Sequence, residues 1–317
     1  MERFTAFVTG GTGVLGRPTV RRLLGAGNRV RVLSRSAASE RVARELGAEP
    51  VRGSLFEPAS LARAMLGAQA VLHVATRIPA RRDRSHPGAW DENNRIRTDG
   101  TRLLVDVALG AGIETLVYAG IGFTYRDRGA AWIDAAGESL EPLPVIRSSL
   151  AAEREVERFT AAGGRGVALR LGYVYAPEAA STRDAIALAR RGIAALPGAA
   201  EGYVSQIRAD DAAAALVAAM ERAPAGTYDV VDDEPLTRRE LARVIGRAAG
   251  RRWLLRPPRW AVRLAEGQER MFATRSLRIS NRRFREATGW SPAVPSAREG
   301  WARIAEALRA SGAPHPD

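Results

Sequence analysis

A cluster of glycines follows the first β-prone run of the chain, and its spacing is suited to binding phosphate. Gly11, Gly13 and Gly16 form the pattern Gly-x-Gly-x-x-Gly, and Gly10 precedes them. Glycine permits a sharp turn there, and its bare backbone lets a pyrophosphate approach closely. The N–H groups at the beginning of the following helix attract the same phosphates. We therefore predict a dinucleotide site on this glycine loop, residues 10–16, with these contact residues: Gly10, Thr12, Gly13, Val14, Leu15 and Gly16.

The end of the second predicted strand indicates which dinucleotide binds. An NAD enzyme places an acidic residue there, about 20 residues past the glycine loop, to bind the ribose hydroxyls. Here the strand ends in Ser34, Arg35 and Ser36, and the first acidic residue is Glu40. Arginine pairs well with a 2′-phosphate, and the two serines offer hydroxyl donors. We predict NADP(H) rather than NAD(H); the alternative is that Arg35 is a solvated residue at a strand end.

These residues lie in a part of the chain where short β-prone runs alternate with helical patterns. The predicted strands cover residues 4–9, 30–33, 50–51, 70–75, 115–118, 166–171 and 227–231. Apolar residues at helical spacing predict helices at 17–25, 39–46, 60–66, 100–111, 148–160, 210–220, 237–249 and 296–308. Such alternation predicts an α/β fold of the Rossmann type, a doubly wound parallel sheet.

The second half of the chain is more mixed, although one helix start is well marked. Thr237 and Glu240 have the Thr-x-x-Glu spacing of a capping box. We assign residues 1–177 to an NADP-binding Rossmann domain, to which residues 203–232 return. Residues 178–317 are assigned mainly to a smaller C-terminal substrate-binding lobe.

The composition excludes several kinds of chemistry. The chain has 317 residues and 48 basic side chains, all of them arginine. Without lysine, Schiff-base catalysis and a phosphate-binding P-loop are excluded. Without cysteine, disulfides, thiol nucleophiles and Cys-ligated metals are excluded. The three histidines are widely spaced, so we predict no metal site.

Charge and hydropathy bear on location and partners. The formal charge is +13, with 46% apolar and 26% charged residues, as in a folded globular protein. The arginines are scattered in pairs and form no basic arm, so we expect no nucleic-acid partner. We find no signal-peptide pattern and no apolar run near the roughly 18–20 residues of a membrane span. We expect a cytoplasmic protein with no membrane partner.

The glycine loop resembles the glycine motif of extended short-chain dehydrogenases/reductases, of the NAD(P)-dependent epimerase/dehydratase type. The resemblance covers nearly the whole chain. Residues 53–55 match the place that packs adenine, although the family's usual aspartate is Ser54 here. Residues 73–76 match the strand end beside the cofactor, and residues 170–177 match the strand that borders nicotinamide. The resemblance implies the same fold and adds these cofactor residues to the predicted site: Ser54, Leu55, Ala75, Thr76 and Gly172.

At the expected catalytic centre the chain departs from this family. Members use a Ser or Thr, a Tyr, and a Lys four residues after the Tyr; the tyrosine supplies or takes the carbonyl proton. Alignment places Val145 at the tyrosine position and Ser149 at the lysine position, and residues 118–122 contain no serine. The catalytic residues are therefore unassigned. The candidates are Tyr125, Ser148 and Ser149, with packing as the alternative for Tyr125 and helix N-capping for the serines.

In this family, segments beyond residue 177 enclose the substrate, and residues 192–202 and 251–271 are the segments expected here. The second is rich in aromatic and soft apolar residues, which suit a large polycyclic or aromatic ligand; a hydrophobic cap against the core is the alternative. Its arginines would receive an acidic group. The residues concerned there and just beyond are Trp253, Arg256, Arg259, Trp260, Met271 and Phe272. We expect this small-molecule substrate as partner and, as is common in the family, a homodimer.

The missing triad makes the chain similar to the ketoreductases that tailor aromatic antibiotics in actinobacteria. That resemblance implies an NADPH-dependent ketoreductase that reduces a carbonyl on a bulky aromatic secondary metabolite. Water or a substrate hydroxyl would supply the proton, and catalysis would rest on positioning and desolvation. Two alternatives stay open. One is a non-catalytic NADP(H)-binding redox sensor similar to NmrA-like regulators, and the other is a nucleotide-sugar epimerase or dehydratase, which would require the missing tyrosine.

Overall fold

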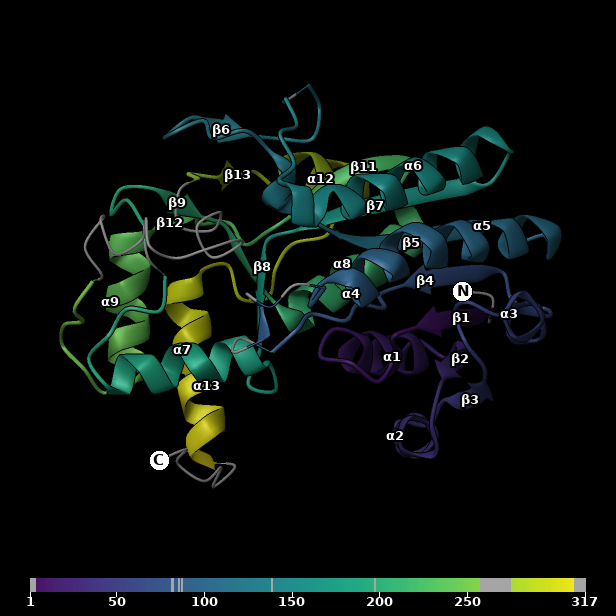
Figure 1. Cartoon of the computed structure of the whole chain (residues 1–317), viewed down its shortest axis with the longest axis horizontal. Helices are drawn as coiled ribbons and strands as arrows, with labels where there is room; N and C mark the ends of the chain where they lie inside the picture. The colour runs from purple at the N-terminus through teal and green to yellow at the C-terminus, as the bar shows by residue number, and fades with distance from the viewer. Residues whose placement is uncertain are drawn as a thin grey trace.

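A seven-stranded parallel sheet forms the centre of the molecule (Figure 1). The computed structural model describes residues 4–80, 83–84, 86, 88–137, 139–196, 198–256 and 275–310, with only the backbone of Val145. Along the sheet the strands follow the order β11-β7-β5-β4-β1-β2-β3. Their bounds are β1 (Thr5–Thr9), β2 (Arg29–Ser34), β3 (Glu49–Arg52), β4 (Ala70–His73), β5 (Thr115–Ile121), β7 (Arg165–Leu171) and β11 (Gly226–Val230). The order reverses beside β1, which is where open parallel sheets bind ligands.

Helices cover both faces of this sheet. On one face α1 (Gly16–Gly25) packs beside α8 (Ala209–Arg222), and apolar residues of both helices share a core with β1, β2 and β7. The other core lies beneath α3 (Pro58–Met65), α5 (Thr101–Gly110) and α6 (Arg147–Ala161). The remaining helix at this end of the sheet is α2 (Ala37–Glu45), and α4 (Asp91–Arg95) leads into α5 through the π-helical turn η2 (Ile96–Gly100).

Three helices pack against one another beyond the sheet, at the left of Figure 1. They are α7 (Ala180–Arg190), α9 (Arg238–Ala248) and α13 (Ala297–Ala310), and they surround Tyr175 and Trp301, whose rings stack 5.4 Å apart. The other elements in the described part of the chain are short. These are η3 (Gly122–Thr124), β6 (Trp132–Ile133), η4 (Pro144–Ile146), β8 (Tyr173–Tyr175), β9 (Tyr203–Val204), β10 (Gln206–Arg208), β12 (Leu236–Thr237), β13 (Arg278–Ile279) and α12 (Arg282–Thr288).

The predicted α/β Rossmann-type fold is confirmed, and so is the capping box of α9. The Thr237 hydroxyl accepts from the Glu240 N–H, and the Glu240 carboxylate accepts from the Thr237 N–H. The patterns did not reveal α7, α12 or the short strands, because each is stabilised by contacts between distant segments. No helix in the described ranges has the length and apolar character to cross a bilayer.

Candidate functional site

The glycine loop joins β1 to α1 at the carboxyl edge of the sheet, and close packing requires glycine at two of its positions. Gly10 has a φ of +73°, and a Cβ there would lie 2.6 Å from the Cα of Ala75. A Cβ on Gly16 would lie 2.1 Å from the Gly10 carbonyl oxygen. Gly13 differs: it is exposed, and a Cβ there would meet only that carbonyl, at 3.3 Å. The space outside Gly13 is therefore open to a ligand, as a pyrophosphate site requires.

The other loop residues use their side chains for packing, which leaves the backbone to face a ligand. Val14 packs against Ala176, and Leu15 packs on the core beneath α1. The Arg17 side chain donates to the Thr12 carbonyl oxygen at 2.8 Å. This geometry fits a dinucleotide pyrophosphate bound by backbone N–H groups at the beginning of α1.

At the end of β2, Arg35 lies at the surface with its side chain 58% exposed. Its Nη1 forms an ion pair with Glu92 Oε1 at 3.2 Å. Ser36 is exposed and caps α2, accepting from the Ser39 N–H at 3.2 Å. Ser34 is fully buried, and its hydroxyl donates within its own strand. Of the two predicted hydroxyl donors, only Ser36 is accessible to a cofactor.

The cofactor residues added by the resemblance divide into buried and accessible ones. Leu55 is buried against Gly100, where a Cβ would lie 2.5 Å from the leucine Cδ2. Gly172 is buried too, with a Cβ position 2.8 Å from the Ser205 carbonyl oxygen. The Leu55 side chain is therefore part of the hydrophobic core, and glycine at position 172 allows the backbone at Ser205 to approach closely. The remaining three are partly or fully exposed: Ser54, Ala75 and Thr76.

The two candidate serines lie in the first turn of α6 and do not cap it. The N-cap residue is Ile146, and it makes no side-chain cap. Ser148 donates to Asn94 Oδ1 at 2.9 Å, and Ser149 Oγ lies 3.4 Å from the Tyr118 hydroxyl. The N-capping alternative is wrong, because both hydroxyls face inward and bind groups from neighbouring elements. The hydroxyl of Ser149 is buried and bonded to another neutral hydroxyl.

The described residues near the expected catalytic position offer no obvious proton donor. Val145 lies in η4, so no tyrosine stands at that point. His73 is buried at the end of β4, with Nδ1 2.6 Å from Thr9 Oγ1 and Nε2 3.2 Å from Thr101 Oγ1. Burial, and then the positive charge of Arg97, lower the pKa of His73 to about 3. His73 is therefore neutral at physiological pH and fully hydrogen-bonded.

Tyr125 lies inside the fold in a buried polar network. Its hydroxyl donates to Asp229 at 2.8 Å and accepts from Arg170 at 3.0 Å. Arg170 also binds both carboxylate oxygens of Glu153, at 3.0 and 2.6 Å. Burial raises the pKa of Tyr125 above its ordinary value. The Tyr125 hydroxyl is therefore hydrogen-bonded to two buried groups and is not accessible to a substrate.

Most of the chain matches a known protein family. Residues 6–231 match the model of the NAD dependent epimerase/dehydratase family. The chain belongs to this family. Membership agrees with the seven-stranded sheet and with a glycine loop that fits a dinucleotide.

Relatives of this family member include reductases. The 3-diazoavenalumate denitrifying reductase of Streptomyces sp is 33% identical over 308 residues, covering 93% of this chain and 98% of the relative. The 2-alkyl-3-oxoalkanoate reductase of Stenotrophomonas maltophilia is 27% identical over 256 residues, covering 77% of this chain and 75% of the relative. A solved structure, UDP-glucose 4-epimerase of Thermus thermophilus with NAD, has a TM-score of 0.74 at 23% identity, covering 98% of this chain and 100% of that one. Family and relatives together make this an oxidoreductase with an NAD(P) cofactor.

Beyond Gly172, aromatic and basic residues line a cavity that we call the aromatic pocket. Its lining includes Phe123, Tyr173, Leu196, Tyr203, Arg238 and Arg275. Arg238 Nη2 donates to the Arg275 carbonyl oxygen at 2.7 Å. Burial, and then the charge of Arg256, lower the pKa of Arg238 to about 10. An anionic group in this pocket would oppose both effects and stabilise the charged guanidinium.

The two predicted substrate segments contribute unequally among the described residues. The segment 192–202 supplies Leu196 to the aromatic pocket, and Arg256 donates to the Gly198 carbonyl oxygen at 2.8 Å. Trp253 is 75% exposed and does not line the pocket. Four predicted residues lie outside the described part of the chain: Arg259, Trp260, Met271 and Phe272.

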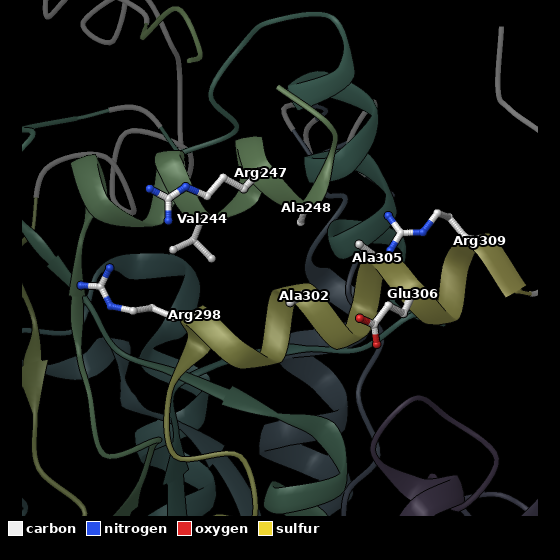
Figure 2. Close-up of a pocket in the computed structure, with 8 residues that line it drawn as sticks. All are labelled: Val244, Arg247, Ala248, Arg298, Ala302, Ala305, Glu306 and Arg309. Atoms are coloured by element: carbon white, nitrogen blue, oxygen red, sulfur yellow. The ribbon is translucent and has the colours of Figure 1, made fainter. Parts of the chain in front are cut away.

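A separate groove lies between α9 and α13 (Figure 2). Alanines line it together with Arg247, Arg298 and Arg309. None of its lining residues belongs to the predicted cofactor or catalytic set. In the described segments no group of three metal-binding side chains comes together there or elsewhere.

The buried network around Tyr125 predicts a pH dependence of stability. Glu153 already neutralises Arg170, and burial raises the pKa of Asp229 from 3.8 to about 7. Between pH 3.8 and about 7, Asp229 keeps its proton in the folded state and loses it in the unfolded chain. The free energy of unfolding therefore falls as the pH rises through this range. Asp229→Asn is expected to remove this loss, making the variant more stable relative to wild type at about pH 8 than at about pH 5.

Urea unfolding at the two pH values measures this difference. Asp106→Asn is the control, because Asp106 is exposed and pairs with Arg158 at the surface. Equal stability differences between Asp229→Asn and wild type at both pH values would contradict the raised pKa.

Proposed function

We propose that this family member is an NADPH-dependent reductase of a bulky aromatic acid, in a reaction that takes no proton from the protein. One combination supports the proposal: the glycine loop has a geometry that fits a dinucleotide, whereas sequence alignment places Val145 and Ser149 at the positions of the family's tyrosine and lysine. When bound, the reduced dinucleotide supplies a hydride. The residues that would hold it are the glycine loop, Arg35, Ser36, Ala75 and Thr76.

The preference for NADPH is proposed from Arg35. A charge-assisted hydrogen bond to phosphate is worth about 1.5–3 kcal/mol. Arg35→Ala is therefore expected to weaken NADPH binding about tenfold or more and to leave NADH binding unchanged. Calorimetric titration of both cofactors measures this. Arg41→Ala is the matched control, since Arg41 is an exposed arginine of α2. An equal loss for both cofactors would argue against a 2′-phosphate contact.

The aromatic pocket supports an aromatic acid as substrate. Phe123, Tyr173 and Tyr203 contribute aromatic surface to its lining, but its volume is about 20 Å³, so binding a planar ring would require the lining residues to move apart. Arg238 adds a buried positive charge suited to a carboxylate or phenolate. The ligand would thus be held by its ring and its acidic group, leaving the reacting carbon near Gly172.

The first substrate class is an aromatic diazo acid. A reductase named for a denitrifying reaction on 3-diazoavenalumate is 33% identical over nearly the whole chain. When hydride replaces dinitrogen on an aromatic carbon, a C–H bond forms and the C–N electron pair leaves with N2. No oxyanion is formed and no proton is required. The absence of the family's tyrosine and lysine would therefore not slow this reaction.

The second substrate class is an aromatic ketone with a neighbouring hydroxyl group. The support for the ketone is the similarity to a reductase named for 2-alkyl-3-oxoalkanoates, and the aromatic ring is proposed from the aromatic residues of the pocket. Hydride addition to a ketone leaves an alkoxide, which a hydrogen-bonded substrate hydroxyl or ordered water can protonate. In this reading the chain is a ketoreductase without the usual triad.

The deciding experiment incubates the protein with NADPH and carboxylated aryl diazonium salts or hydroxyaryl ketones. We expect NADPH oxidation with release of N2, and deuterium transfer from labelled NADPH to the ring carbon. Oxidation with ketones alone would favour the second class. Cofactor binding without turnover of any member of either panel would overturn the reductase proposal and favour a redox sensor. Turnover of UDP-sugars alone would favour an epimerase.

A further inference from the structure

Arg97 is a buried cation for which the described residues provide no counter-charge. It lies in the π-helical turn η2 and is 3% exposed. Its Nε is buried without a hydrogen-bond partner, and no ion pair of its guanidinium is found within the described ranges. Arg170, which is similarly buried, binds two carboxylate oxygens and a tyrosine hydroxyl. A buried charge without such partners is costly, and π-helical turns occur frequently at functional sites.

The surroundings of Arg97 lie beneath the carboxyl edge of the sheet. Its charge acts on His73 and Tyr118, which are neighbours across β4 and β5. His73 in turn is bonded to Thr9, the residue immediately before the glycine loop. Arg97 is therefore close to the edge where the predicted dinucleotide lies.

Three of the groups near Arg97 are neutral, and the one carboxylate near the same tyrosine, Glu153, is paired with another arginine. His73 is uncharged because of its low pKa, and burial raises the pKa of Tyr118, which keeps its hydroxyl protonated. Ser149 contacts the same tyrosine hydroxyl but carries no charge. The carboxylate of Glu153 is bound on both oxygens by Arg170. The acceptors that Arg97 lacks must therefore come from a ligand or from water.

We propose that Arg97 binds the nicotinamide nucleotide half of the cofactor, donating N–H groups to its ribose and phosphate oxygens. Ser149, at the position of the family's lysine, has a neutral hydroxyl and supplies no positive charge at this edge. Arg97, in η2, places a positive charge near Tyr118, the tyrosine whose hydroxyl Ser149 contacts. The inference rests on the dinucleotide binding of the proposed function and is independent of the substrate.

The test compares a whole cofactor with a fragment that lacks the nicotinamide nucleotide. Arg97→Met is expected to weaken NADPH binding at least tenfold and to leave the binding of adenosine 2′,5′-bisphosphate unchanged. The ligand-free variant is expected to unfold at a higher temperature than wild type, because an unpartnered buried charge is removed. Arg97→Lys keeps the charge and should retain NADPH affinity within a few-fold.

Arg95→Met is the matched control, because Arg95 is an exposed arginine two residues away. NADH and adenosine monophosphate form a second ligand pair, so a failed NADPH preference is distinguished from a failed Arg97 contact. Wild-type NADPH and NADH affinity in Arg97→Met, or an equal loss for cofactor and fragment, would overturn the proposal. If Arg97→Met does not fold, Arg97→Gln is compared with wild type in the same way, and the same two results would overturn the proposal.

Discussion

Arg170→Met is expected to lower the free energy of unfolding by about 3–5 kcal/mol, the usual loss when one partner of a buried ion pair is removed. Arg170 joins three groups from different elements: Glu153 of α6, Tyr125 beyond η3, and Asp229 of β11 through that tyrosine. Its removal would leave the Glu153 carboxylate buried without a cation. The methionine side chain fills much of the space but donates none of these hydrogen bonds.

Denaturant unfolding of Arg170→Met and of Arg158→Met measures the effect against a control. Arg158 pairs with Asp106 at 2.7 Å at the surface, where ion pairs contribute about 0–1 kcal/mol. Because Glu153 is the group left unpaired, Arg170→Met with Glu153→Gln should recover part of the loss. A loss below about 1 kcal/mol in Arg170→Met would show that the network does not stabilise the fold as its geometry indicates.

Gly13→Ala is expected to bind NADPH roughly 10- to 100-fold more weakly, since forcing a methyl group into a close contact costs about 1–3 kcal/mol. The fold should tolerate the change. In the protein itself the new Cβ meets only the Gly10 carbonyl oxygen, at 3.3 Å, and the residue is exposed. The loss therefore falls on the ligand, whose pyrophosphate would occupy the space outside the loop.

Calorimetry with NADPH and thermal unfolding without it separate the two effects. Gly25→Ala is the control, because Gly25 ends the same helix and a Cβ there meets nothing within 4 Å. Gly16→Ala should unfold the loop instead, given a 2.1 Å approach to the Gly10 carbonyl oxygen. Full NADPH affinity in a folded Gly13→Ala would mean that no pyrophosphate passes over this loop.

The features that the sequence predicted well depend on residues close together in the chain. The capping box of Thr237 and Glu240 spans a single helical turn, and the glycine loop spans residues 10–16. The boundary of β5 was predicted at residue 118, but the strand runs to Ile121, because β7 pairs with it along that whole length. Long-range pairing extends a strand beyond its locally β-prone run.

The role of a side chain was harder to predict than its element. Ser148 and Ser149 were interpreted as possible caps because serine often begins a helix, yet both lie within the first turn, after the N-cap residue Ile146, and bind Asn94 and Tyr118. Arg97 was missed, although one signal was present. Arg97, Thr101, Leu104 and Ala108 fall at helical spacing, so an arginine stands on the buried stripe.

By itself, the sequence determined the strand–helix alternation, the glycine loop, and the absence of any lysine that could serve as the family's catalytic residue. These follow from residue types and local spacing, which act through backbone geometry within a few residues. The tertiary structure alone decided which polar groups meet. Tyr125 and Asp229 are 104 residues apart, and Arg97 of η2 lies close enough to Tyr118 of β5 for its charge to act on that hydroxyl. Their partners depend on how the elements pack, and only folding brings those elements together.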